Sequence, residues 1–210
     1  PVEIEFAVNT EHGECPDFSI LQIRPISGCS GYNDISITAS EKERALVYAE
    51  KVMGNGEENS IRDIITIKPE AFRREDMPAM ATELDMLNRL ADGEYVLIAA
   101  GRLGSSDRWL GIPCTWSGIS KAHVIVETGL KEIQAEPSQG THFFQNMTSL
   151  GCLYLTINPM YNDGIADYDA IRRLPLVRET EHFIHVKADE PLLIKANGLR
   201  HMAVIALREE

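Results

Sequence analysis

Tyr95-Val96-Leu97-Ile98-Ala99-Ala100 is the stretch that decides the fold of this 210-residue chain. An apolar run with no alternating polar residue is typical of a strand covered on both faces of a sheet. A polar run rich in glycine and serine, residues 101–107, follows it directly. In open α/β sheets, ligands bind beyond the carboxyl ends of such strands. The stretch therefore predicts a central strand that leads into a candidate binding loop.

The residues around this strand predict an α/β (α+β) fold, with a mixed β-sheet body and few helices. A helix is expected over residues 76–91, where apolar side chains recur at helical spacing. Residues 40–43 look like a capping box, residues 45–49 fit a helix or a strand, and residues 138–150 look helical. Further strands are expected at 64–68, 122–127, 152–157, 183–187, 192–195 and 202–207.

The start of the chain predicts a β-hairpin. Residues 2–8 and 18–25 largely alternate apolar and polar side chains, and a polar connector with turn residues joins them. The hairpin carries a carboxylate (Glu5), an amide (Gln22) and a guanidinium (Arg24). A junction rich in Gly, Ser and Asn follows. We therefore expect a hairpin at residues 1–27 and a separate mixed α/β domain at residues 35–210.

The hairpin resembles the closing hairpin of the ATP-grasp domain in phosphoenolpyruvate synthases and pyruvate phosphate dikinases. The resemblance rests on E-I-E-F-A at residues 3–7 and L-Q-I-R-P at residues 21–25. It implies ATP and Mg²⁺ as cofactors, with Glu5 and Gln22 on the metal and Arg24 on a phosphate. The glycine-rich loop and the lysine of an ATP-grasp site are absent from the sequence. From composition alone, two amphipathic strands with solvent-facing polar residues are the alternative.

Two further segments carry candidate chemistry. Arg102, Gly104, Ser105 and Ser106 can form an anion-binding nest after the central strand, and a tight Ser/Asp turn is the alternative. His142 enters the helix predicted over 138–150 and is the candidate catalytic residue, with helix capping as the alternative. The segments G-R-L-G-S-S-D-R-W-L-G-I-P and P-S-Q-G-T-H-F-F-Q-N extend the resemblance to phosphoenolpyruvate synthase-like bacterial proteins. The resemblance assigns no chemistry to them.

The composition of the chain argues against several classes of function. The net charge of −12 argues against a nucleic-acid partner, which needs clustered Lys and Arg. No apolar run approaches the ~20 residues that span a bilayer, so no membrane association is expected. The four cysteines match no zinc or C-x-x-C pattern, which favours reduced thiols and a cytoplasmic setting.

Three hypotheses of function follow. In the first, the chain is the C-terminal fragment of an ATP-dependent phosphotransferase similar to pyruvate, water dikinase, and its accessory domain binds an anion or nucleotide. This fragment would have no activity alone, and its partner would be the ATP-grasp domain of the same polypeptide. In the second, the body is an independent phosphotransfer or hydrolase domain centred on His142. In the third, the chain is a structural module that docks on that domain or forms a homo-oligomer.

Overall fold

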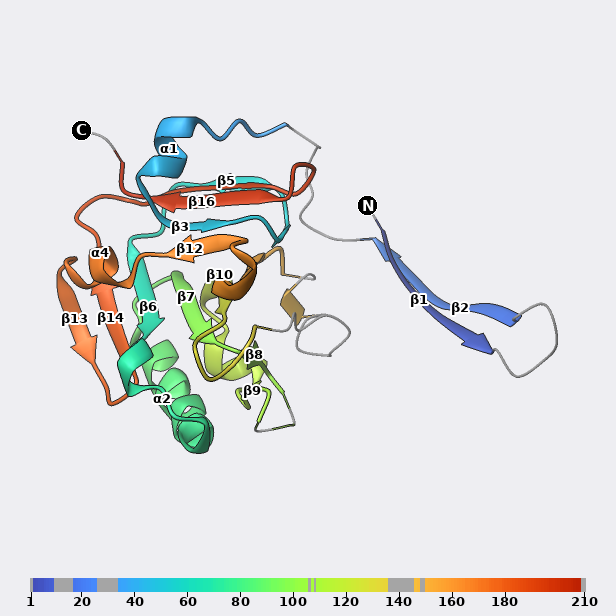
Figure 1. Cartoon of the computed structure of the whole chain (residues 1–210), viewed down its shortest axis with the longest axis horizontal. Helices are drawn as coiled ribbons and strands as arrows, with labels where there is room; N and C mark the ends of the chain where they lie inside the picture. Colours follow the sequence, from blue (N-terminus) through green and yellow to red (C-terminus); the bar gives the residue numbers. More distant parts are fainter. Residues whose placement is uncertain are drawn as a thin grey trace.

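A computed structural model describes residues 2–9, 17–25, 34–105, 107, 109–135, 146–147 and 150–208. Its body has two stacked β-sheets with a helix layer on the outer face of the larger sheet (Figure 1). The expected class, a mixed β-sheet body with few helices, is confirmed. The described residues contain no helix long and apolar enough to cross a membrane.

The larger sheet has seven strands and a parallel centre. From edge to edge they are β13 (Leu176–Glu179), β14 (Phe183–Lys187), β6 (Asp63–Ile67), β7 (Tyr95–Ala100), β10 (Ala122–Thr128), β11 (Leu153–Ile157) and β4 (Val52–Met53). Strands β6, β7, β10 and β11 are parallel neighbours, whereas β13, β14 and β4 pair antiparallel at the two edges. The polar residues that follow the parallel strands therefore gather at one edge of the sheet.

The smaller sheet is antiparallel and packs on one face of the larger one (Figure 1). Its strands, in order, are β12 (Gly164–Ala166), β3 (Ala45–Ala49), β16 (Met202–Ala206), β15 (Leu193–Asn197) and β5 (Gly56–Glu58). Residues 45–49, which fitted a helix or a strand, thus form β3, all of whose residues are buried. Val96 and Ile98 of β7 face this sheet.

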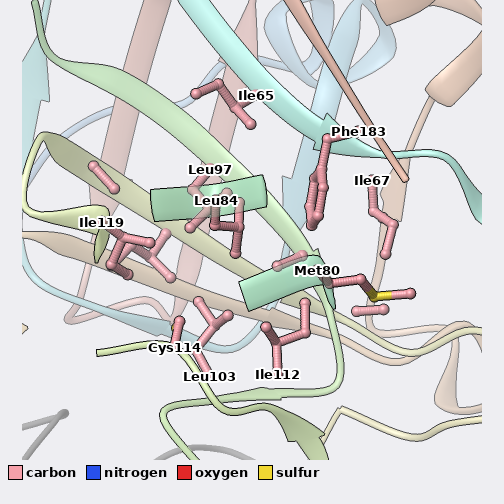
Figure 2. Close-up of a cluster of buried hydrophobic side chains, with 14 of the residues drawn as sticks. Ile65, Ile67, Met80, Leu84, Leu97, Leu103, Ile112, Cys114, Ile119 and Phe183 are labelled. Atoms are coloured by element: carbon pink, nitrogen blue, oxygen red, sulfur yellow. The ribbon is translucent and has the colours of Figure 1, made fainter. Parts of the chain in front are cut away.

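The other face of the larger sheet is covered by α2 (Met77–Leu90). Met80 and Leu84 of this helix pack with Leu97 of β7, as Figure 2 shows. The prediction that β7 is covered on both faces is confirmed, because each of its residues is buried. Asp76 stands at the N-cap position of α2, but its side chain makes no capping hydrogen bond. The helix ends at Ala91, whose backbone is extended.

Short elements complete the body. Helix α1 (Ala39–Glu43) is capped by Thr38 and Glu41, so the capping box begins two residues before the expected Ser40. The remaining elements are α4 (Tyr168–Arg172), β8 (Arg102–Leu103), β9 (Gly111–Ile112), and the 3₁₀ helices η1 (Pro69–Ala71), η2 (Arg74–Asp76), η3 (Trp116–Ile119) and η4 (Pro159–Tyr161). Most of the helix expected over 138–150 lies outside the described residues.

The predicted hairpin is present as β1 (Val2–Asn9) and β2 (Asp17–Pro25), an antiparallel pair that forms a sheet of its own (Figure 1). Its register shifts after Glu5, so Leu21 is an extra residue in β2. The division into functional domains at residues 27 and 35 stays a prediction.

Candidate functional site

The register of the hairpin brings two of the predicted site residues together. Glu5 lies directly opposite Gln22, and both side chains are exposed. Arg24 lies opposite Glu3 and two residues beyond Gln22. Directly opposed residues share a face of an antiparallel pair, with Cβ atoms about 5 Å apart. Glu5 and Gln22 can therefore offer oxygen ligands to one cation.

The predicted anion loop begins where β7 ends. Gly101 and Gly104 both have a φ of +68°, a left-handed conformation that favours glycine. The amide of Gly104 donates to the Ile112 carbonyl at 3.0 Å, and the amide of Leu103 donates to the Glu127 carboxyl at 2.8 Å. A Cβ on Gly101 would lie 2.4 Å from Cδ1 of Ile133. These two amides therefore bond within the protein, and Gly101 allows the loop to pack closely against Ile133.

Ser105 closes a turn within the same loop. Its side chain is 8% exposed, its hydroxyl donates to the Asp107 carbonyl at 2.9 Å, and it accepts from the Asp107 amide at 3.1 Å. Asp107 accepts from the amide of Trp109 at 2.9 Å. These contacts fit the tight-turn alternative. Binding of an anion by Arg102, Gly104 and Ser105 stays a prediction, and Ser106 and His142 lie outside the described residues.

Sequence reasoning missed Glu127, a fully buried carboxyl group near the end of β10. One of its oxygens accepts from the Leu103 amide, and the other accepts from the Tyr154 hydroxyl. Glu127 thereby joins β8, β10 and β11 at the edge where the parallel strands end. Its signal in the sequence is a single acidic residue that ends the apolar run 124–126.

The end of β11 carries a second polar connection at this edge. The side chain of Asn158 accepts from the Ala135 amide at 2.9 Å and donates to the Ala135 carbonyl at 2.7 Å. The Asn158 amide donates to Asp163, which also pairs with Lys51 at 2.9 Å. The carboxyl edge of the sheet is therefore a network of polar groups that hold its loops in place.

A separate group of carboxylates surrounds His182 just before β14. One ligand atom each from Glu83, Glu181 and His182 lies within 4.8 Å of the others, which would suit a metal ion. His182 is buried, and its Nδ1 lies 2.7 Å from Glu83 while its Nε2 lies 3.4 Å from Asp76. Both ring nitrogens are thus occupied by carboxylates, so the contacts describe a link between α2 and β14.

Two partly buried carboxylate–histidine contacts are expected to make the stability of the body depend on pH. Burial alone would raise the pKa of Glu83, but hydrogen bonds from Thr180 and His182 outweigh burial and lower this pKa from 4.5. Burial would also raise the pKa of Asp63, but hydrogen bonds from His185 and Lys187 outweigh burial and lower this pKa from 3.8.

We expect this stabilisation to be complete above about pH 5 and to be lost as the pH falls, because a carboxylate with a lowered folded-state pKa binds its proton more readily when unfolded. Urea unfolding between about pH 6 and pH 3 measures the loss. Glu83→Gln should reduce the dependence of the unfolding free energy on pH. Glu75→Gln, at an exposed residue nearby, should leave this dependence unchanged. Equal slopes for Glu83→Gln and the unsubstituted chain would contradict the assignment.

Three hollows on the described part of the body lie away from several of the predicted site residues. These hollows, of about 370, 270 and 230 Å³, contain neither Glu5, Gln22, Arg102 nor Ser105 in their lining. The largest lies beside the edge strand β4 and is lined by Glu50, Lys51, Val52, Met53, Tyr154, Thr156 and His201.

Comparison with known proteins gives no relative for this chain. No family model, curated protein or solved structure matches it.

Proposed function

We propose that the chain is the C-terminal part of a phosphoenolpyruvate synthase-like, ATP-dependent phosphotransfer protein. In this proposal the hairpin β1–β2 closes the nucleotide site of an ATP-grasp domain, and the α/β body is an accessory domain. The observation that carries the proposal is the pairing of Glu5 with Gln22 across the hairpin. The resemblance assigns metal binding to these same two residues.

The chemistry of the proposed site follows from these side chains. Carboxylate and amide oxygens are hard ligands that suit Mg²⁺, so Glu5 and Gln22 would hold the ion bound to the nucleotide phosphates. Arg24 would bind a phosphate through two parallel hydrogen bonds, as guanidinium groups do. Ala7 and Ser19, paired next to Glu5 and Gln22 on the same face, are small and leave room for a ligand.

The loop after β7 carries a second proposed binding site, on the body of the protein. Arg102 and the neighbouring Gly104 and Ser105 stand at the carboxyl edge of the parallel strands, where ligands bind in sheets of this kind. We propose an anion as the ligand. The free thiols of Cys114 and Cys152 support a reducing, cytoplasmic setting.

The 210-residue chain is expected to bind Mg-ATP weakly, with a Kd of roughly 1 mM or above. The hairpin supplies only part of a clamp, and each missing charge-assisted hydrogen bond costs roughly 1.5–3 kcal/mol. Isothermal titration calorimetry measures the affinity. In the full-length protein that the proposal implies, ATP should bind, and Arg24→Ala should weaken it at least about tenfold. Micromolar binding by the 210-residue chain, unchanged by Arg24→Ala, would contradict the proposal.

An oligomerisation module is the second candidate function. It is favoured by the large apolar side chains that the hairpin exposes. Such groups are uncommon as a contiguous patch on a monomeric protein and usually mark an interaction surface.

A further inference from the structure

The hairpin has one apolar face. Its cross-strand register pairs Ile4 with Ile23, Phe6 with Ile20, and Val8 with Phe18. Because opposed residues share a face and alternate residues return to it, these three pairs form one continuous surface. We call these six residues the apolar face.

Every side chain of the apolar face is open to solvent. Their exposed fractions run from 46% to 59%, and the rings of Phe6 and Phe18 lie 5.0 Å apart between centroids at 31°. Two strands alone cannot cover such a surface, and an isolated hairpin is marginally stable in water. The apolar face therefore needs a partner that removes it from water.

We propose that the apolar face binds the same face of a second copy, so that the chain forms a dimer through stacked hairpins. This deepens the second candidate function, an oligomerisation module, and rests on it, whereas the phosphotransfer function concerns the opposite face with Glu5 and Gln22. A two-fold interface requires a patch that complements itself, and the apolar face of a strand pair can stack on its own copy as two packed sheets do.

The lack of charge on the apolar face and the area that it can bury both favour a second copy of the chain as the partner. None of the six residues is charged, so the contact itself brings no like charges together despite the net charge of −12. At roughly 100 Å² of exposed side chain each, the two faces would bury on the order of 1,200 Å² in total, which reaches the lower end of stable interfaces.

Sedimentation equilibrium without nucleotide tests the dimer at about 100 µM, where any dimer with a micromolar Kd is populated. The unsubstituted chain should be dimeric. The double variants Phe6→Glu/Phe18→Glu and Phe6→Lys/Phe18→Lys should each dissociate at least about tenfold more readily. Mixing the two variants should restore dimers, because opposite charges then meet. Ser19→Glu, on the opposite face, is the matched control and should leave dimerisation unchanged.

Three outcomes would overturn the proposal. They are a monomeric unsubstituted chain, a dimer that survives the glutamate variant, and a mixture of variants that recovers no dimer. A monomer would leave the apolar face to another occupant, such as the rest of a nucleotide-binding domain. Since nucleotide binding is measured separately on variants of the polar face, failure of the dimer leaves the proposed phosphotransfer function standing.

Discussion

Leu84→Ala is expected to lower the free energy of unfolding by about 3–4 kcal/mol, the upper part of the range for a buried leucine. Leu84 is fully buried on α2, between the helix and the larger sheet. Its side chain packs in the cluster around Leu97 and Ile119 that Figure 2 shows. The loss combines the transfer free energy of the deleted atoms with the cavity that remains, because the close-packed surroundings collapse only partly.

Met86→Ala is the matched control for this prediction. Met86 lies on the same helix but is 40% exposed, so its truncation should cost less than about 1 kcal/mol. Urea unfolding followed by circular dichroism measures both variants. Equal losses for Leu84→Ala and Met86→Ala would show that α2 does not pack on the sheet through the face described here.

Glu127→Ala is expected to cost about 3 kcal/mol of stability and to loosen the loop after β7. The substitution removes the acceptor from the Leu103 amide and the Tyr154 hydroxyl, both in buried surroundings. A buried donor left without an acceptor loses its hydration without compensation. Glu127→Gln keeps one carbonyl oxygen as an acceptor, so it should cost less.

The thiol of Cys114 reports on the same loop. Burial raises the pKa of this thiol to about 12, so it should react slowly in the folded protein. Labelling of Cys114, followed by mass spectrometry of its peptide, should become faster in Glu127→Ala. It should stay slow in Glu132→Ala, which removes an exposed carboxylate. Unchanged stability and unchanged labelling in Glu127→Ala would refute the role of Glu127 as the link between these strands.

Much of the fold follows from local patterns. The uninterrupted apolar run of Tyr95–Ala100 predicted a strand covered on both faces, and the helical spacing of Met77, Met80 and Leu84 predicted the buried face of α2. One cap was predicted wrongly, because Thr38 forms the capping box of α1 with Glu41 in place of Ser40.

The candidate site could be predicted less completely, because burial and register are properties of the assembled sheets. Glu127 reads as an ordinary strand residue until β8 and β11 close over it. Glu83 and His182, separated by almost a hundred residues, meet only when α2 lies beside β14. The pairing of Glu5 with Gln22 depends on the extra residue Leu21, which alternation alone did not reveal.

Mg-ATP binding by the full-length protein that the proposal implies is the most direct test of the central claim. Calorimetric titration should be run on the unsubstituted protein, on Glu5→Gln and on the hairpin control Ser19→Ala, each with and without Mg²⁺. If the polar face of the hairpin holds the metal, Glu5→Gln should weaken Mg-ATP binding at least about tenfold while Mg-free ATP binding and Ser19→Ala stay unchanged. Mg-ATP affinity that is the same in all three proteins would contradict the account.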